Sequence, residues 1–319
     1  MNLPEVLLIG GMGFVGRQLQ GPLLSAGYKV HVIDRKSARK GQNDNIEYYE
    51  CLLFDEYILN DIMTRCKIVF YLASDSVPTT TSRSPSREGE LNLIPFLKFL
   101  DAFQDCRQTH LVYLSSGGTI YGNRVEIPVV ESSPIAPISY HGAGKAAIEA
   151  FLHASVNQGD NRITILRPSN LYGPFQNYVP GFGIIRSMME KLRLDLPIEI
   201  WGDGENIRDY LYIDDLISAC MACAQMDRTE QHFRIFNVSS GQSISINQLC
   251  GFIEEATEKK LKKAYLPGRE IDVRSVILDA SKIKKEMGWE AVVGIEEGLK
   301  RTWQWLNHPY EQRKEAKLL

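Results

Sequence analysis

The stretch that decides the fold is EVLLIGGMGFVG, residues 5–16. It begins with a short apolar run and continues with Gly10, Gly13 and Gly16. A short apolar run that ends in glycine is typical of a buried strand, and the periodic apolar residues that follow predict a helix. Glycines at such a junction let the backbone turn tightly and approach a phosphate, which the free N–H groups of the helix N-terminus attract. The stretch therefore predicts a strand, a phosphate-binding turn and a helix.

The next strand-like run, KVHVID at 29–34, ends in Asp34. A carboxylate at this point can accept hydrogen bonds from both ribose hydroxyls of an adenosine, and it would repel the extra phosphate of NADP. We therefore predict NAD as the cofactor, with NADP left open by Arg35, whose guanidinium could pair with that phosphate. Around these two strands and the later apolar run IVFYLA, residues 68–73, the expected cofactor-binding residues are Gly10, Gly13, Phe14, Val15, Gly16, Asp34, Arg35, Leu72, Ala73 and Ser74.

Strand-like and helical stretches alternate through the first half of the chain. Apolar runs recur as IEYYE, IVFYLA, HLVYLSS and RITILRP, with helical stretches near 88–105 and 141–157. Strands separated by crossover helices predict a doubly wound α/β domain with a parallel sheet. We assign residues 1–170 to this domain and 171–319 to a smaller α/β lobe that interleaves with it. The polar stretch 74–89 is expected to form a mobile loop.

Composition favours a small-molecule partner. The 319 residues carry 36 Lys and Arg against 39 Asp and Glu, for a net charge of -3, without a long basic block. A nucleic-acid partner is therefore not expected. Neither a leader peptide nor an apolar run of membrane-spanning length is recognisable, so we expect a cytoplasmic protein without a membrane partner.

The six cysteines are scattered, unlike those of a disulfide-rich secreted domain. Cys220 and Cys223 form a CxxC inside a helical run, but a second pair that would complete a zinc site is missing. We interpret them as buried thiols and expect no metal.

Longer motifs identify a family resemblance. The glycine spacing G-x-x-G-x-x-G resembles that of the extended short-chain dehydrogenase/reductases. The chain is similar within that branch to NDP-sugar epimerases of the UDP-galactose 4-epimerase type. This similarity runs through LSSGGTIYG, RPSNLYGP, GDGENIRDYLYIDD, PGREIDV and LDASKIKKEMGW, in the family's order over nearly the whole chain. The resemblance implies a Rossmann domain, bound NAD, a UDP-sugar substrate and a homodimer formed by the helices near 88–105 and 141–157.

The family's acid/base pair is altered here. Its members carry a Tyr and a Lys with three residues between them on one helix, where the Lys also holds the nicotinamide ribose. In ISYHGAGKAAIE, residues 138–149, four residues separate Tyr140 from Lys145. Residues at i and i+4 lie within about 40° around a helix, whereas i and i+5 lie about 140° apart. His141 therefore occupies the position of the family's Tyr, and we predict His141 and Lys145 as the catalytic pair.

Three readings of this change remain open. The enzyme is impaired, or the imidazole of His141 is a working base, or Tyr140 swings into the site. A neutral imidazole has an ordinary pKa near 6.5, which suits general-base work better than that of a free phenol. A cationic Lys145 and a positive nicotinamide would lower the pKa of the imidazole and make it a weaker base.

A second departure concerns the hydroxyl that assists the pair in the family. Four residues before the Tyr of the YG motif, where the family often has that hydroxyl, this chain has Gly117. Thr119 is the predicted substitute, with Ser116 behind it. Gly117 and Gly118 also replace the Asp–Glu pair by which related 4,6-dehydratases remove water.

The expected contacts to a nucleotide sugar come from Asn170 and from the second lobe. By the resemblance, Asn170, Arg208 and Arg269 contact the diphosphate, a role that suits the forked donors of arginine. Val276 matches the position that sets the pocket width, and it leaves room for an N-acetyl group. We therefore predict an NAD-dependent 4-epimerase of a UDP-sugar such as UDP-GlcNAc/UDP-GalNAc or UDP-Glc/UDP-Gal. The alternatives are an impaired nucleotide-sugar or NAD-binding protein and a keto-sugar oxidoreductase.

Overall fold

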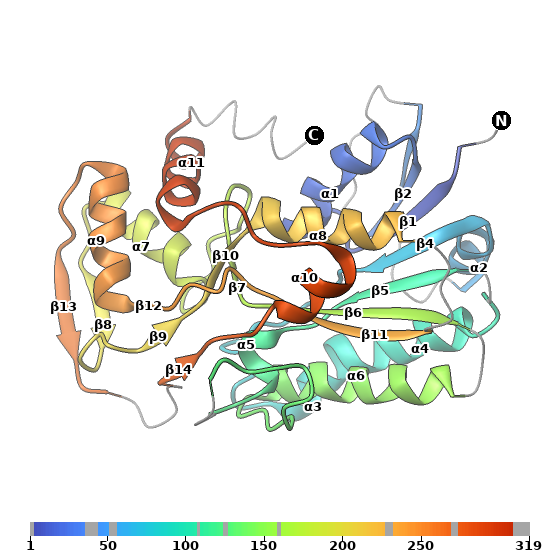
Figure 1. Cartoon of the computed structure of the whole chain (residues 1–319), viewed down its shortest axis with the longest axis horizontal. Coiled ribbons are helices and arrows are strands. Elements are labelled where there is room, and N and C mark those ends of the chain that lie inside the picture. Colours follow the sequence, from blue (N-terminus) through green and yellow to red (C-terminus); the bar gives the residue numbers. More distant parts are fainter. Residues whose placement is uncertain are drawn as a thin grey trace.

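Seven parallel strands form the central sheet, in the order β11-β6-β5-β4-β1-β2-β3 (Figure 1). The computed structural model describes residues 3–35, 44–50, 56–106, 109–123, 127–157, 161–226, 232–268 and 274–308. The sheet strands are β1 (Glu5–Ile9), β2 (Lys29–Asp34), β3 (Ile46–Glu50), β4 (Cys66–Tyr71), β5 (His110–Leu114), β6 (Arg162–Pro168) and β11 (Phe233–Val238).

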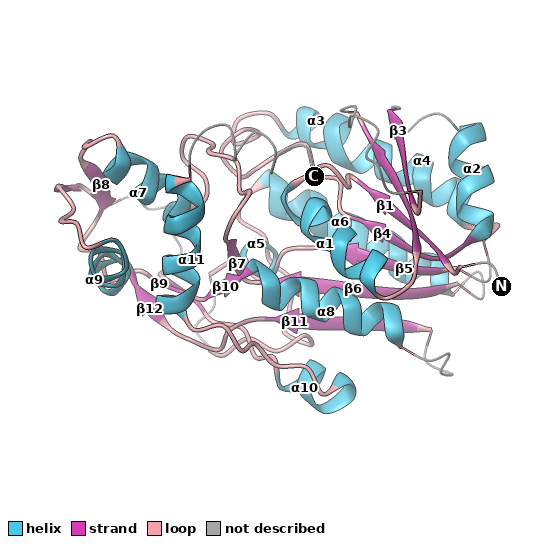
Figure 2. Ribbon diagram, turned by 90° about the horizontal axis from the view of Figure 1, so that it is seen from above, coloured by secondary structure: helices cyan, strands magenta, loops and turns pink. Residues whose placement is uncertain are grey.

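Both faces of the sheet are buried beneath helices, as Figures 1 and 2 show. Along β1 the side chains alternate: Val6 and Leu8 pack in one apolar core, and Leu7 and Ile9 pack in the other. Two buried faces explain why these strands read as continuous apolar runs. The elements around the sheet are α1 (Phe14–Ser25), α2 (Glu56–Arg65), α3 (Pro85–Glu88), a π-helix η1 (Gly89–Leu93), α4 (Ile94–Phe103), α5 (Gly117–Ile120), α6 (Tyr140–Val156) and α8 (Ile213–Gln225).

The strand order reverses between β1 and β4. In a doubly wound sheet, ligands bind beyond the carboxyl ends of the strands at such a point. The predicted glycine turn follows β1, and the segment 72–74 follows β4. The doubly wound parallel fold is thus confirmed, and it brings two predicted cofactor-binding segments to the same place.

Shorter elements from the second half of the chain gather beyond one end of the sheet (Figure 1). Strand β11 also comes from this half, yet it pairs with β6 in the central sheet. The division of the chain at residue 170 stays a prediction. The remaining elements are β7 (Asn170–Tyr172), α7 (Ile184–Arg193), β8 (Ile198–Trp201), β9 (Ile207–Arg208), β10 (Tyr210–Tyr212), β12 (Ile244–Ser245), α9 (Ile246–Thr257), β13 (Lys263–Leu266), β14 (Ser275–Val276), α10 (Ser281–Met287) and α11 (Ile295–Asn307).

Two expectations change in the structure. The polar stretch 74–89 was expected to be a loop, but it ends in α3, and its Ser76, Thr81 and Glu88 are buried. On the two helices expected to pair two subunits, Phe96, Leu100 and Leu152 pack inside the chain's own core. The homodimer stays a prediction. Among the described residues, no helix is long and apolar enough to cross a membrane.

Candidate active site

The glycine turn between β1 and α1 is too tight for larger residues. Gly10 has a φ of +77°, and a Cβ there would lie 2.7 Å from the backbone Cα and N of Ala73. A Cβ on Gly16 would lie 2.5 Å from the Cα of Gly11. Gly13 caps α1 without a side-chain hydrogen bond. The backbone at the start of the helix is therefore not covered by side chains of the turn. This is the arrangement that a pyrophosphate requires in order to approach the backbone N–H groups.

Phe14 and Val15 form the first turn of α1, where helical geometry leaves the N–H groups without partners inside the helix. Leu72 extends the pairing of β4, because its N–H donates to the carbonyl of Ile9 at 2.9 Å. Ser74 follows two residues later, and its hydroxyl bonds to the carbonyl of Ser76 at 3.4 Å. These predicted cofactor residues thus lie on the two segments that follow β1 and β4, the strands between which the strand order reverses.

Asp34 ends β2 beside the glycine turn. Its Oδ2 accepts a hydrogen bond of 3.0 Å from the N–H of Met12, which fixes the carboxylate at the turn. Arg35 is ion-paired with Asp75. This pairing supports NAD over NADP, because the guanidinium that could attract an extra phosphate already has a carboxylate partner.

The register of α6 separates Tyr140 from His141. Ser139 is the N-cap, and its hydroxyl accepts a hydrogen bond of 3.1 Å from the N–H of Gly142. Tyr140 is 43% exposed, whereas His141 and Lys145 are each 8% exposed. The imidazole and the ammonium group therefore lie on one buried row of the helix, and the phenol lies on another face.

Lys145 is positioned by a hydrogen bond to the last residue of β5. Its Nζ donates a hydrogen bond of 2.9 Å to the carbonyl of Leu114 and lies 5.0 Å from the ring centroid of Tyr113. Burial lowers the pKa of Lys145 to about 8, although Glu88 and Glu149 act in the opposite direction. One proton of Nζ is thus used for positioning, which leaves two for a ligand.

His141 is a neutral imidazole at pH 7. Burial, and then the charge of Lys145, lowers the pKa of His141 to about 4, while Glu88 opposes this shift. The Nδ1 atom lies 2.9 Å from Oγ of Ser76. Among the described residues, Nε2 has no hydrogen-bond partner. The imidazole is thus anchored on one side and open to exchange a proton on the other.

Thr119 lies beside the start of α6. Its carbonyl oxygen would be 2.5 Å from a Cβ on Gly142, and its Oγ1 is buried without a partner among the described residues. A side chain at Gly117 would be crowded, because a Cβ there would lie 2.3 Å from a terminal methyl group of Leu278 and 2.9 Å from the carbonyl oxygen of Arg167. Ser116 is the N-cap of α5, but its side chain makes no capping hydrogen bond. Thr119 therefore has the stronger case as the assisting hydroxyl.

The predicted substrate contacts lie on neighbouring strands. The side-chain amide of Asn170 donates to the carbonyl of Asp209 at 3.0 Å. Arg208 is half-buried on β9, where Val276 of β14 is its partner in a parallel ladder. Val276 itself is 5% exposed. Arg208, which is expected to bind the diphosphate, and Val276, which is expected to set the width of the sugar pocket, thus lie side by side. Arg269 lies outside the described residues.

Three buried polar residues near His141 were not predicted from the sequence. Ser76, Glu88 and Asn92 are each at most 8% exposed and are linked by hydrogen bonds. A signal for two of them was present: Glu88, Asn92, Phe96 and Leu100 recur every four residues. That spacing places a carboxylate and an amide in register with apolar core side chains.

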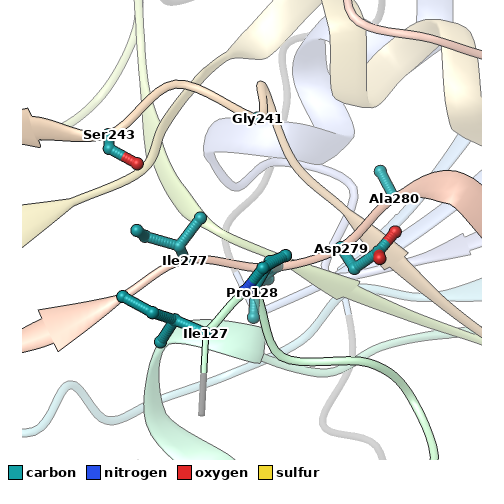
Figure 3. A pocket seen from close by; sticks show the side chains of 8 residues that line it. Ile127, Pro128, Gly241, Ser243, Ile277, Asp279 and Ala280 are labelled. Carbon is teal, nitrogen blue, oxygen red and sulfur yellow. The ribbon is translucent and has the colours of Figure 1, made fainter. Parts of the chain in front are cut away.

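A hollow of about 510 Å³ lies elsewhere, between the segments around 127, 241 and 279 (Figure 3). It is lined by Ile127, Pro128, Gly241, Ser243, Ile277, Leu278, Asp279 and Ala280. None of the predicted site residues is among them. We therefore place the active site at the carboxyl end of the sheet and not in this hollow.

The fold and the glycine turn define an α/β protein of the dinucleotide-binding class, with a Lys and a His in register on one helix. The chain belongs to the NAD dependent epimerase/dehydratase family, which it matches over residues 6–239. The family's cofactor is NAD, and the glycine turn and Asp34 fit it.

Similar proteins carry related names. The chain is 32% identical to a UDP-glucose 4-epimerase of Thermotoga maritima solved with UDP-glucose, with 95% of this chain and 98% of that one covered and a TM-score of 0.86. It is 26% identical to a UDP-N-acetylglucosamine 4-epimerase of Methanobrevibacter ruminantium in complex with UDP-N-acetylmuramic acid, with coverage of 96% and 99% and a TM-score of 0.87. A UDP-glucose 4-epimerase of Mycolicibacterium smegmatis is 28% identical over 306 residues, which cover 93% of this chain and 97% of that relative.

Proposed function

We propose that the chain is an NAD-dependent 4-epimerase of a UDP-sugar and that His141 is its acid/base residue. The observation that carries this proposal is the pairing of His141 with Lys145 on one buried row of α6. In a family whose members act through NAD, this pair lies at the carboxyl end of the sheet, where the glycine turn would hold the cofactor.

The chain's own groups have separate tasks in this scheme. Nε2 of His141 accepts the proton of the sugar's 4-hydroxyl and later returns it, which a neutral imidazole can do. Lys145 hydrogen-bonds the nicotinamide ribose with the Nζ protons that Leu114 leaves free. Oγ1 of Thr119 hydrogen-bonds the same region of the sugar, which would satisfy its missing partner.

Bound NAD would supply the hydride acceptor and donor for C4 of the sugar, and it would be unchanged over a cycle. Asn170 and Arg208 are proposed to hold the diphosphate, with Arg269 as a further candidate. This binding leaves the sugar free to turn between the two transfers. Because nothing is consumed, the enzyme needs no second substrate.

Val276 supports a sugar pocket that admits both hexoses and N-acetylhexosamines. A β-branched side chain at this position occupies less space than an aromatic ring, and its ladder with Arg208 fixes its backbone. The relatives named above include enzymes for UDP-glucose and for UDP-N-acetylglucosamine. We therefore propose the two pairs UDP-Glc/UDP-Gal and UDP-GlcNAc/UDP-GalNAc as substrates.

The test is an assay of the purified protein on both pairs without added NAD. We expect each epimer to be converted to its partner until equilibrium, with no net change in absorbance at the reduced nicotinamide band. Binding of the UDP-sugars without any conversion would contradict the proposal and indicate a binding protein. Stoichiometric oxidation or reduction of the cofactor would indicate an oxidoreductase.

A further inference from the structure

A buried polar cluster, which we call the relay cluster, surrounds Nδ1 of His141. Its members come from the segment between β4 and α4 and from α6, and each is at most 8% exposed. The relay cluster consists of Ser76, Thr81, Glu88, Asn92 and His141. Burying polar side chains is costly unless they are hydrogen-bonded to one another, so such a cluster calls for a reason.

Glu88 is the acceptor at the centre of the relay cluster. Its Oε2 accepts hydrogen bonds of 2.6 Å from Ser76 and 3.0 Å from Thr81, and its Oε1 accepts one of 2.8 Å from Asn92. A Cβ on Gly144 would lie 2.8 Å from Oε1, so the carboxylate rests directly on the backbone of α6. Three donors stabilise a carboxylate in this position.

The local backbone is irregular where it presents these groups. Between α3 and α4 the helix widens into the π-turn η1, which the N–H of Ile94 closes by donating to the carbonyl of Gly89. Single π-turns within helices are frequent at functional sites. Here the π-turn contains Asn92 and directly follows Glu88, so the two polar side chains belong to one widened turn.

The hydrogen bonds fix the orientation of the Asn92 amide. Its Oδ1 accepts a hydrogen bond of 2.8 Å from the N–H of Asp75, so its Nδ2 is the atom that faces Ser76 and Glu88. Nδ2 then donates to both, at 2.8 Å each. The amide therefore has a donor and an acceptor in defined places.

The orientation of Ser76 follows, and with it the tautomer of His141. A serine hydroxyl has one proton and two acceptor positions. Ser76 donates that proton to Glu88 and accepts from Asn92, so towards His141 it can only accept. Nδ1 of the neutral imidazole must therefore carry the proton, and Nε2 must carry the lone pair.

We propose that Glu88, acting through Ser76, is a positioning residue that holds His141 as the Nδ1–H tautomer, with Nε2 ready to take the sugar's O4 proton. This inference deepens the proposed function and rests on it. During the transfer the O4–H bond breaks and the Nε2–H bond forms. No proton moves to Glu88, which remains a carboxylate, with Oε1 4.0 Å from Nδ1 and able to stabilise the imidazolium.

Two opposite charges face His141 in this arrangement. Lys145 on α6 opposes protonation of the imidazole, and Glu88 on α3 favours it. The other groups in hydrogen-bond contact with the ring or with Glu88 are the neutral side chains of Ser76, Thr81 and Asn92. Loss of the Glu88 charge should therefore slow formation of the imidazolium more than it weakens sugar binding.

The first test reads the tautomer directly, without substrate. The holoprotein is labelled with ¹⁵N at histidine, and the His141 signals are identified by their absence from His141→Gln. We expect long-range proton–nitrogen spectra at pH 7 to show a protonated Nδ1 and an unprotonated Nε2. In Ser76→Ala the two tautomers should mix, and Ser76→Thr, which keeps the hydroxyl, should restore the Nδ1–H form. An Nε2–H tautomer in the wild type would overturn the inference.

The second test separates positioning from binding. In Glu88→Gln we expect kcat to fall at least about tenfold while KM changes less than twofold, in line with the loss of a group that assists proton transfer. Glu90→Gln is the matched control, because Glu90 lies on the same π-turn but is exposed. Unchanged kcat in a folded, NAD-loaded Glu88→Gln would contradict the inference. An Nδ1–H tautomer in a protein that converts no UDP-sugar would instead overturn the proposed function alone.

Discussion

The hydroxyl of Thr119 is a buried polar group, and its proposed role in the site would come at the expense of stability. Its Oγ1 is buried and has no partner among the described residues. A buried, unsatisfied polar group costs about 1–3 kcal/mol. In the proposed function, a hydroxyl of the sugar would provide the missing partner.

We predict that Thr119→Val lowers turnover of the UDP-sugar about tenfold while leaving the melting temperature unchanged or higher. Valine has nearly the same shape, so the change removes only the unsatisfied hydroxyl. Thr119→Ser, which retains the hydroxyl, is the control and should keep most of the turnover. A Thr119→Val variant that melts lower and turns over normally would show that the hydroxyl has a structural role instead.

For single residues, the sequence was sufficient to predict features that depend only on the local geometry of a helix. The rule that i and i+4 share a helix face placed His141 with Lys145 and separated Tyr140, as the burial of the three residues confirms. The partners of His141 could not be found in this way. Ser76 is 65 residues away in the chain, and its contact depends on how α6 packs against the segment before α4.

Among the elements, two helical glycines differ in the space that a side chain would find around them. Gly16 has no room for a Cβ, which would lie 2.5 Å from backbone atoms of Gly11. Gly251 lies inside α9, where a Cβ would have no atom of the described residues within 4 Å apart from its chain neighbours and its own helix. The first glycine is needed for close packing at the turn, whereas the second only weakens the helix.

Gly16→Ala should therefore yield protein with little bound NAD and a lower melting temperature. Gly251→Ala should keep its NAD and gain up to about 1 kcal/mol of stability, because alanine is the better helix former. Both can be checked by measuring dinucleotide released on denaturation and by thermal unfolding. Equal NAD content in the two variants would contradict the assignment of the glycine turn.

Regular helices and strands were predictable because the spacing of their apolar residues can be recognised directly in the sequence. Six strands of the central sheet and the helices near 88–105 and 141–157 were expected close to where they lie, whereas β11, which comes from the second half of the chain, was not predicted. The π-turn η1 was not, because it depends on burying Glu88 and Asn92 against α6. The polar composition of 74–89 suggested a solvated loop, since composition does not reveal hydrogen bonds between distant side chains.

For the whole molecule, the alternation of strands and helices was enough to predict a doubly wound parallel sheet. The surfaces that pair two subunits could not be predicted in the same way. An apolar helix face can pack against the chain's own core or against a second subunit, and the sequence pattern is the same in both cases. Phe96 and Leu152 face that core, whereas Ile94 and Phe151 are exposed. The last two are the residues through which the predicted homodimer could still form.

Acid should destabilise the whole fold through its buried imidazoles. The pKa of His141 is lowered to about 4 in the folded state, below its ordinary value near 6.5. Between these values the unfolded chain binds more protons, so the free energy of unfolding falls as the pH drops through this window. Burial lowers the pKa of His110 to about 3, which acts in the same direction.

We predict that from pH 7 to pH 5 the wild type loses about 2 kcal/mol more stability than His141→Gln, by the relation of about 1.4 kcal/mol for each pKa unit. Urea unfolding at the two pH values measures this difference. His110 titrates in both proteins, so its contribution cancels. Equal losses would show that the imidazole of His141 is not held neutral by the fold.

The most direct test of the proposed epimerisation follows the hydrogen on C4 of the sugar. A UDP-sugar with deuterium at C4 is turned over in ordinary water by the purified protein without added NAD. We predict that both epimers keep the deuterium at C4 through many turnovers, because the same hydrogen leaves and returns while only the O4 proton passes through His141. Loss of deuterium to water, or accumulation of a 4-keto sugar with reduced cofactor, would contradict the account.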